Sequence, residues 1–180
     1  MSDVLSSVRV GYDRWANVYD HDANPLQALE EPFMRRAIGD PRGLKTLDLG
    51  CGAGTITRML AAHSDRITAV DFSPKAIALA KTNSAGFEHI EYIQGDIRNV
   101  AFSDYDLIVC SEVLYYLFQE ELRKLIGKLY TSCGTGTEII IVGKYRDHSI
   151  SGILESYCTE TGRIEKPHTR RPYAIIAYRF

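Results

Sequence analysis

Three acidic residues, Asp48, Asp71 and Asp96, stand at or just after the ends of short apolar runs. A carboxylate in such a place can accept hydrogen bonds from the hydroxyl or amino groups of a ligand. The first of them opens the stretch Asp-Leu-Gly-Cys-Gly-Ala-Gly, which ends at Gly54. Because glycines let the backbone approach a ligand without a Cβ atom in between, this stretch predicts a turn that binds a nucleotide.

The spacing of the glycines distinguishes two kinds of nucleotide. A pyrophosphate-binding turn follows the pattern G-x-G-x-x-G, which counted from Gly50 requires a glycine at position 55. Thr55 occupies that position, and the third glycine comes one residue earlier. Asp71 follows Gly50 by 21 residues, a spacing at which a carboxylate meets ribose hydroxyls in doubly wound folds. We therefore expect Asp71 to bind a ribose, and the glycine spacing disfavours a nicotinamide-dependent reductase.

Short apolar runs alternate with helical patterns, which predicts βαβ units and a mostly parallel sheet. The strands are predicted at residues 44–49, 66–71, 90–93, 105–110 and 138–142, followed by a weak strand at 163–165 and a strong one at 173–178. Apolar residues three and four apart predict an amphipathic helix at 119–131. Asp71 has an alternative role as a helix cap, but Ser73 and Pro74 already supply a cap and a first helical residue.

The glycine motif and the acids that follow it resemble the class I S-adenosylmethionine-dependent methyltransferases, whose first motif is an acid, any residue, then G-x-G-x-G. The resemblance covers residues 10–20 and 44–143, and the rest in outline. It implies a Rossmann-like, doubly wound α/β fold with a mostly parallel seven-stranded sheet in the order 3-2-1-4-5-7-6, the last strand antiparallel. It also implies a single domain, residues 1–180, with an N-terminal helical lid at 1–40 and a Rossmann-like core at 41–180.

The resemblance further implies that S-adenosylmethionine is the cofactor and S-adenosylhomocysteine its product. In that family the glycine turn holds the methionine part of the cofactor, and the corresponding residues here are Asp48, Gly50, Cys51 and Gly52. We interpret Cys51 as a small residue that fits the turn rather than as a nucleophile, because no base stands at a recognisable spacing from it.

Residues after the second, third and fourth predicted strands take the other cofactor roles of the family. Phe72 corresponds to the apolar neighbour of the adenine ring. Asp96 corresponds to the acid that accepts the adenine amino hydrogen, and the backbone amide of Ile97 to the donor to a ring nitrogen. Ser111 follows the fourth run, at the strand end where the family brings residues beside the sulfonium and the acceptor.

An aromatic stripe precedes the predicted sheet. Tyr12, Trp15 and Tyr19 fall at i, i+3 and i+7, one face of a helix. The surrounding pattern resembles the lid of small-molecule methyltransferases, and aromatic faces attract a cation such as a sulfonium by about 0.5–2 kcal/mol. The alternative is a helix docked by this stripe. The pairs 24–25 and 31–32 each end in proline and predict interruptions before the next helix.

The segment after the fourth predicted strand carries the candidate catalytic residues. An amine acceptor must lose a proton before it attacks, and Glu112, Tyr115, Tyr116 or His148 could assist. His148 is expected in the loop after the fifth strand, where an exposed histidine without a catalytic role is the alternative. Residues 106–117 also resemble the rhizobial nodulation N-methyltransferases, which act on the free amine of a chitooligosaccharide. An amino sugar is therefore one expected acceptor.

Other acceptor classes remain alternatives: a carboxylate, a protein or an RNA. Glu112 and Glu121 reproduce the two-glutamate spacing of protein arginine methyltransferases, which we interpret as chance because that family adds a barrel domain. A non-catalytic S-adenosylmethionine-binding module is a further alternative. The retained glycines and acids argue against it, because a disused pocket has no need of them.

Composition narrows the classes of partner. The 180 residues carry a net charge of −2, which gives no whole-molecule attraction to nucleic acid or to an anionic membrane. A small-molecule acceptor is therefore favoured. The four cysteines show no metal-binding spacing and predict reduced thiols in a cytoplasmic protein without a metal. Leader and membrane-span patterns are also not found, and the sequence does not indicate an oligomeric state.

Overall fold

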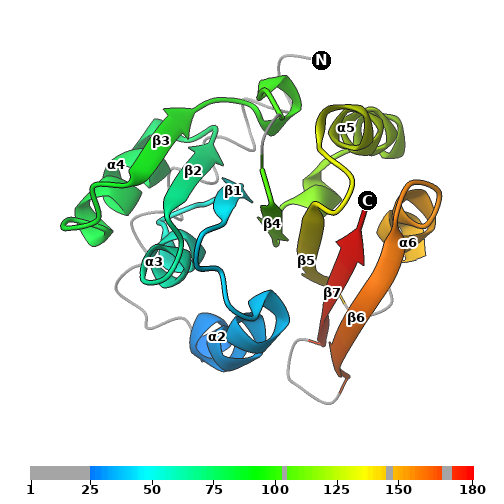
Figure 1. The fold of residues 1–180 in the computed structure, drawn as a ribbon, viewed down its shortest axis with the longest axis horizontal. Helices are drawn as coiled ribbons and strands as arrows, with labels where there is room; N and C mark the ends of the chain where they lie inside the picture. Colours follow the sequence, from blue (N-terminus) through cyan, green and yellow to red (C-terminus); the bar gives the residue numbers. More distant parts are fainter. Residues whose placement is uncertain (1–24, 103–104, 145–147, 168–171) are drawn as a thin grey trace.

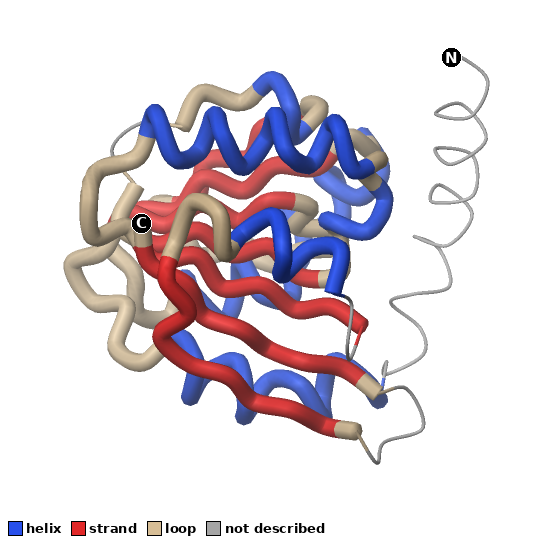
Figure 2. Tube along the Cα trace, turned by 90° about the vertical axis from the view of Figure 1, so that its right-hand side faces the viewer, coloured by secondary structure: helices blue, strands red, loops and turns tan. Residues whose placement is uncertain are grey.

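A seven-stranded sheet with helices on both faces forms the molecule (Figures 1 and 2). The computed structural model describes residues 25–102, 105–144, 148–167 and 172–180. The strand order is β3-β2-β1-β4-β5-β7-β6. This confirms the predicted Rossmann-like fold and the predicted order.

Five parallel strands make up the larger part of the sheet. They are β1 (Lys45–Leu49), β2 (Arg66–Asp71), β3 (Ile90–Gln94), β4 (Leu107–Ser111) and β5 (Glu138–Lys144). β7 (Tyr173–Arg179) runs antiparallel to β5 and to β6 (Thr159–Lys166). Every predicted strand is present, and β6 is longer than predicted because it pairs with β7 along its whole length.

Three helices cover one face of the sheet: α2 (Pro25–Ile38), α3 (Thr55–Ala61) and α4 (Pro74–Asn83). The other face is covered by α5 (Gln119–Ser132) and α6 (His148–Leu154). Two short 3-10 helices, η1 (Ile97–Asn99) and η2 (Leu114–Tyr116), follow β3 and β4. The apolar face of α5 is buried as its spacing predicts, through Leu122, Leu125, Ile126 and Leu129.

The helix α2 is continuous across Pro32, where we expected an interruption. A proline removes one backbone donor, which weakens a helix at that point. Met34 and Ile38 are nevertheless buried between α2 and the sheet, and this apolar contact stabilises the helix after the proline. The described part of the predicted lid is therefore a packed helix, and the aromatic stripe at positions 12, 15 and 19 lies outside the described residues.

Successive side chains of β1 point to opposite faces of the sheet. Leu47 and Leu49 belong to the core under α5. Thr46 and Asp48 point to the opposite face, where Thr46 contacts Ser64 and Asp48 contacts α3. One face of β1 thus supports packing, while the other anchors the glycine turn that follows it.

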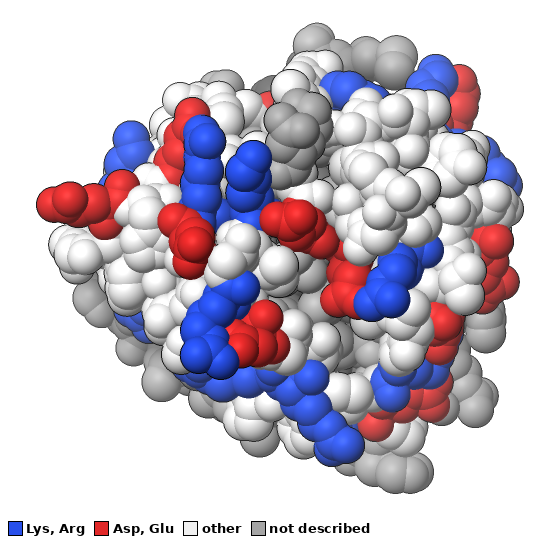
Figure 3. All heavy atoms as spheres, in the orientation of Figure 1, with Lys and Arg blue, Asp and Glu red and all other residues white. Residues whose placement is uncertain are grey.

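Charged side chains of both signs are interspersed over the face drawn in Figure 3. This mixture is in keeping with the net charge of −2. In the part of the chain that the structure describes, no helix is both long and apolar enough to cross a membrane.

Candidate active site

The glycine turn after β1 is held by backbone hydrogen bonds. The amides of Gly50 and Cys51 both donate to the carbonyl of Val70, at 2.8 and 3.0 Å. Gly50 has a φ of +78°, and a Cβ atom there would lie 2.5 Å from Cγ2 of Val113. Only glycine fits, because the left-handed backbone and the close side chain both exclude a larger residue. The contact also brings the segment after β4 against the turn.

Asp48 lies beneath this turn and is almost completely buried. The hydroxyl of Thr57, on α3, donates to its Oδ2 at 2.6 Å. Burial raises the pKa of Asp48 to about 6, and the Thr57 hydrogen bond opposes that rise. In this structure the carboxyl group therefore links β1 to α3 and fixes the shape of the turn.

Asp71 ends β2 beside the same turn and accepts backbone hydrogen bonds. The amide of Gly52 donates to Oδ2 at 3.0 Å, and the amide of Ser73 donates to Oδ1 at 2.9 Å. Burial raises the pKa of Asp71, while these hydrogen bonds lower it. Ser73 caps α4, as predicted, by accepting from the amide of Ala76. Asp71 is thus held by both the turn and the start of α4.

Two neighbours of these acids, Phe72 and Cys51, are also expected to contact the cofactor. Phe72 follows Asp71 and is half-buried. Cys51 is buried within the turn, and burial raises the pKa of its thiol well above the ordinary value. A thiol in this state is a poor nucleophile, which agrees with its interpretation as a small residue that fits the turn.

Asp96 caps η1 after β3, and its carboxylate is bound by Arg98. The Nε of Arg98 donates to Oδ1 and Oδ2 at 2.8 and 2.9 Å, and its Nη2 also donates to Oδ2. These hydrogen bonds hold the pKa of Asp96 below its ordinary value. Arg98 also pairs with Glu121, on α5. The side chain of Ile97 is buried in the core under the same helix.

The segment after β4 brings together the remaining candidates. The Tyr115 hydroxyl donates to Oε2 of Glu112 at 2.9 Å, and the rings of Tyr115 and Tyr116 lie 4.5 Å apart. Burial, followed by hydrogen bonding to Tyr116, raises the pKa of Tyr115. Glu112 has a φ of +54°, an uncommon backbone conformation for a residue other than glycine. Ser111, the last residue of β4, is half-buried and is paired in register with Val142.

The structure brings the glycine turn, Asp71, Asp96 and the segment from Ser111 to Tyr116 to one edge of the sheet, where the parallel strands end. His148 is not in a loop, since its backbone begins α6, and its side chain lies outside the described residues. The roles of Thr57, Arg98 and Val113 escaped the sequence analysis. Arg98 alone had a local signal, because it stands two residues after an acid in a predicted turn.

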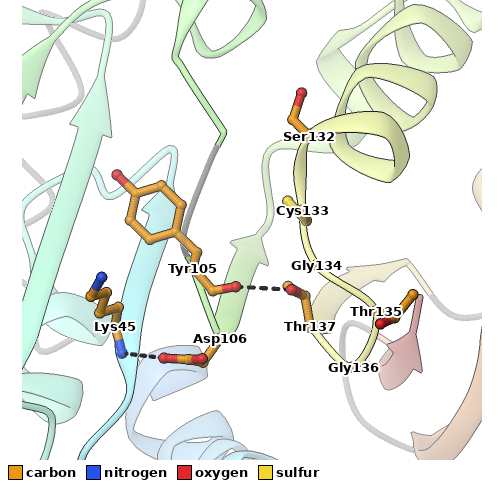
Figure 4. A pocket seen from close by; sticks show the side chains of 9 residues that line it. All are labelled: Lys45, Tyr105, Asp106, Ser132, Cys133, Gly134, Thr135, Gly136 and Thr137. Atoms are coloured by element: carbon orange, nitrogen blue, oxygen red, sulfur yellow. Dashed lines mark hydrogen bonds between the residues drawn. The ribbon is translucent and has the colours of Figure 1, made fainter.

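A polar hollow of about 680 Å³ lies at the opposite edge, where the parallel strands begin (Figure 4). It is bordered by the starts of β1, β4 and β5, and Asp106 there accepts from the amide of Lys45 at 2.9 Å. Ligands of open α/β sheets bind outside the carboxyl ends of the strands. The hollow is therefore separate from the candidate active site. Among the described side chains, no group of three or more His, Cys, Asp or Glu residues is arranged to hold a metal ion.

Comparison with known proteins gives a consistent assignment. The family model described as nodulation protein S (NodS) matches residues 21–159. Nodulation protein S of Bradyrhizobium diazoefficiens is 35% identical over 121 residues, which cover 64% of this chain and 56% of that protein. A malonyl-[acyl-carrier protein] O-methyltransferase of Pectobacterium atrosepticum is 26% identical over 170 residues, which cover 94% of this chain and 65% of that protein.

Solved structures extend the similarity to the fold. The crystal structure of the N-methyltransferase NodS from Bradyrhizobium japonicum WM9 in complex with S-adenosyl-L-homocysteine superposes with a TM-score of 0.85. The sequence identity is 23%, and the match covers 95% of this chain and 97% of that chain. This chain spans about half the length of the curated nodulation proteins that it matches. The chain belongs to the nodulation protein S family, and its fold is that of the class I S-adenosylmethionine-dependent methyltransferases.

Proposed function

We propose that this chain binds S-adenosylmethionine at the carboxyl edge of the sheet and transfers its methyl group to the amine of a small-molecule acceptor. The observation that carries the proposal is the buried Asp71 carboxylate, held by the amide of Gly52 beside the glycine turn. The turn follows β1, which lies between β2 and β4, where the strand order reverses. Open α/β sheets bind ligands at such a switch point.

The residues at this edge fit the proposed cofactor. A Cβ atom built on Gly52 would meet no heavy atom within 4 Å, so a ligand has room to approach the backbone there. Asp71 accepts backbone hydrogen bonds from Gly52 and Ser73, and a backbone hydrogen bond from Phe72 also lowers its pKa. A carboxylate has about four acceptor sites, which leaves capacity for ribose hydroxyls. The lowered pKa keeps Asp96 as a carboxylate, which is the charge state that accepts from an amino group.

The chemistry asked of the protein is mainly alignment. S-adenosylmethionine supplies an activated methyl group on a sulfonium. The protein must hold the acceptor in line with that group, and positioning can supply about 7–11 kcal/mol of such a barrier. Val113 packs against the glycine turn. We therefore propose that Glu112 and Tyr115 lie within reach of the acceptor, with Tyr116 forming part of its binding surface.

An amine is favoured among the acceptors by the charge of Glu112. Its carboxylate accepts a hydrogen bond from Tyr115 and can attract an ammonium group and take its proton. A carboxylate acceptor would be repelled by the same group. A related structure carries the name N-methyltransferase, which also supports an amine. We take the amino sugar suggested by residues 106–117 as the first acceptor to test.

The other predictions on partners belong to the same proposal. With a net charge of −2 we favour a small molecule over a nucleic acid. The four cysteines are free thiols, in keeping with a cytoplasmic location. The lid role of residues 12, 15 and 19 and a contribution from His148 stay part of the proposal.

Calorimetric titration with S-adenosylhomocysteine tests cofactor binding directly. Asp71→Asn removes a charged acceptor and turns an amide group toward backbone donors, so its affinity should fall about 10- to 100-fold. Asp106→Asn is the matched control, because Asp106 also accepts a backbone amide, at the opposite edge. Unchanged binding by Asp71→Asn would contradict the proposed site.

Transfer of labelled methyl groups tests the reaction and the acceptor. The panel contains de-N-acetylated chitooligosaccharides, simple amines, and phenolic and carboxylic acceptors. Labelling of the amino sugar alone would support that acceptor, and labelling of another amine would discard it. Tight S-adenosylhomocysteine binding with no transfer to any class would favour the non-catalytic module. Binding of NADH in its place would overturn the methyltransferase proposal.

A further inference from the structure

Arg98 connects two parts of the carboxyl edge. Its Nε and Nη2 bind the carboxylate of Asp96, and its Nη1 donates to Oε1 of Glu121, in the first turn of α5. Oε2 of Glu121 accepts from the backbone amide of Phe118 at 3.1 Å. A continuous line of hydrogen bonds therefore runs from the acid after β3 to the residue that precedes α5.

This network differs from an ordinary surface ion pair. The side chains of Arg98, Asp96 and Glu121 are 28%, 32% and 26% exposed, so all three are largely shielded from water. Exposed single pairs contribute little to stability, whereas an arginine that binds a carboxylate through two nitrogens fixes its orientation. The arrangement is therefore suited to holding Asp96 in one position.

The backbone around Arg98 is also attached to α5. Lys128 Nζ donates to the carbonyls of Arg98 and Val100, at 3.3 and 2.6 Å. The side chain of Ile97 is buried in the same apolar cluster as Leu122 of α5. These contacts join η1 to α5 as one unit, so a displacement of Asp96 is opposed by the helix.

We propose that Arg98 is a positioning residue, which orients Asp96 toward the adenine of bound S-adenosylmethionine and transmits that contact through Glu121 to the segment 112–118. That segment carries Glu112 and Tyr115, the candidate acceptor-binding residues. The inference rests on the proposed function, because Asp96 meets an adenine only if the cofactor binds at this edge. Filling the adenine position then stiffens the segment that receives the acceptor.

The pH dependence of binding separates positioning from simple structural support. Arg98 lowers the pKa of Asp96, so the side chain of Asp96 stays a carboxylate as the pH falls. Among the described residues, two further ionisable groups contact Arg98: Glu121 pairs with its side chain and Lys128 donates to its carbonyl, both from α5. Without Arg98 the carboxylate becomes protonated at a higher pH, and the loss of affinity in acid should begin at a higher pH.

The test is S-adenosylhomocysteine titration of the full chain from neutral to acid pH, combined with hydrogen exchange. Arg98→Met should weaken binding about tenfold at neutral pH. It should also raise the pH at which affinity begins to fall in acid, which we call the acid limb. Arg98→Lys should restore part of both effects. In the wild type, S-adenosylhomocysteine should slow exchange at the Phe118 amide. Glu121→Gln should lose this protection, because a neutral amide pairs more weakly with Arg98. Its affinity should fall less than that of Arg98→Met, because the contact between Arg98 and Asp96 remains.

Arg163 offers a matched control on β6, the outermost strand on the opposite side of the sheet from β3. It binds both oxygens of Glu160, at 2.8 and 2.6 Å, and lies 3.5 Å from Oε1 of Glu165, with its side chain 32% exposed. Arg163→Met removes an equivalent network on β6. It should leave the affinity, its acid limb and the protection at Phe118 unchanged.

The outcomes distinguish the inference from the function on which it rests. If the wild type does not bind S-adenosylhomocysteine, both fail. If it binds and Arg98→Met has the same affinity and acid limb, the inference fails and the proposed function stands. Should circular dichroism show Arg98→Met unfolded, Arg98→Lys and Glu121→Gln decide the matter. The inference is overturned if Arg98→Lys has the acid limb of the wild type and Glu121→Gln keeps the wild-type protection at the Phe118 amide.

Discussion

The two sides of the candidate active site are built differently. The glycine side, residues 48–54 and 71–73, is largely buried, and backbone amides make most of its hydrogen bonds. Apart from the buried Leu114, the tyrosine side, residues 111–117, presents half-buried and exposed side chains, with Tyr116 48% exposed. The difference teaches that the proposed cofactor site depends on backbone shape as well as on the Asp71 carboxylate, whereas the proposed acceptor site depends on side chains that can change without changing the fold.

The two sides meet where Val113 packs against Gly50. The neighbouring Glu112 keeps its φ of +54° within this contact, and its amide donates to the carbonyl of Val142 at 2.9 Å. Uncommon backbone conformations of this kind persist when surrounding contacts enforce them, and they cluster at functional sites. The glycine side thus helps to hold the tyrosine side in position.

The largest effect is expected where the two sides touch. Gly50→Ala introduces a Cβ atom 2.5 Å from Val113 at a φ of +78°. Backbone strain and overpacking together should lower the free energy of unfolding by roughly 2–4 kcal/mol. Binding of S-adenosylhomocysteine should be lost with it. Chemical denaturation and calorimetry measure the two quantities.

Gly39→Ala is the control for this change. Its φ of +69° is similar, but a Cβ atom there meets nothing within 4 Å. It should cost only about 1 kcal/mol. Adding Val113→Ala should recover part of the stability lost in Gly50→Ala. If Gly50→Ala and Gly39→Ala lower the free energy of unfolding equally, the contact between Gly50 and Val113 does not join the two sides. The same follows if Gly50→Ala combined with Val113→Ala recovers no stability.

The next effect concerns the buried acid of the glycine side. Burial raises the pKa of Asp48 to about 6. A group with a raised folded-state pKa stabilises the fold below its unfolded pKa, near 4, and this stabilisation is lost as the pH rises through about 6. Asp48→Asn removes the charge, and its amide oxygen can still accept from Thr57. It should therefore raise the free energy of unfolding at neutral pH by up to about 3 kcal/mol.

Denaturation at a series of pH values checks this expectation. The wild type should become more stable relative to Asp48→Asn as the pH falls from neutral toward 4. Asp71, whose pKa is also raised, adds a similar trend to both proteins. Parallel stability curves for the two proteins would contradict the assignment of the titration to Asp48.

On the tyrosine side a side chain should affect the rate more than the fold. Glu112→Gln should lower the rate of methyl transfer to an amine about 100-fold, as expected for loss of a general base. Affinity for S-adenosylhomocysteine should stay within about twofold, because the glycine side is untouched. Single-turnover kinetics with labelled S-adenosylmethionine and calorimetry measure the two effects.

Glu112→Gly provides the matched comparison. Glycine adopts positive φ readily, so this variant should be at least as stable as Glu112→Gln and equally inactive. A fully active Glu112→Gln protein would remove Glu112 from the proposed chemistry. Loss of S-adenosylhomocysteine binding in either variant would mean that cofactor binding on the glycine side depends on the tyrosine side.

The smallest effect is expected from Tyr115→Phe. It removes the hydroxyl that donates to Glu112 at 2.9 Å and retains the ring. One hydrogen bond contributes about 1 kcal/mol, which corresponds to roughly a fivefold lower transfer rate. Tyr130→Phe, on the exposed surface of α5, is the control and should have no effect. Equal rates in both variants would show that the Tyr115 hydroxyl is dispensable.

Much of the fold was predictable because its signals are local. Each strand from β1 to β5 is a short apolar run, and the start of α4 is encoded by Ser73 and Pro74. The glycine turn was predictable for the same reason. Three predictions were wrong where contacts between distant residues prevail, and one of them concerns His148, which begins α6 instead of lying in a loop. Burial of Met34 keeps α2 intact past Pro32, and pairing with β7 lengthens β6.

The local order of residues was enough to identify the strands, the glycine turn and the acids at 48, 71 and 96, since backbone propensity and apolar spacing act over a few positions. The partners of those acids depend on the folded chain. Thr57 reaches Asp48 across the strand-to-helix turn, Arg98 reaches Glu121 across 23 positions, and Val113 reaches Gly50 from the segment after β4. Such contacts exist only after the sheet brings separate segments together, so the spacing of residues in the sequence does not predict them.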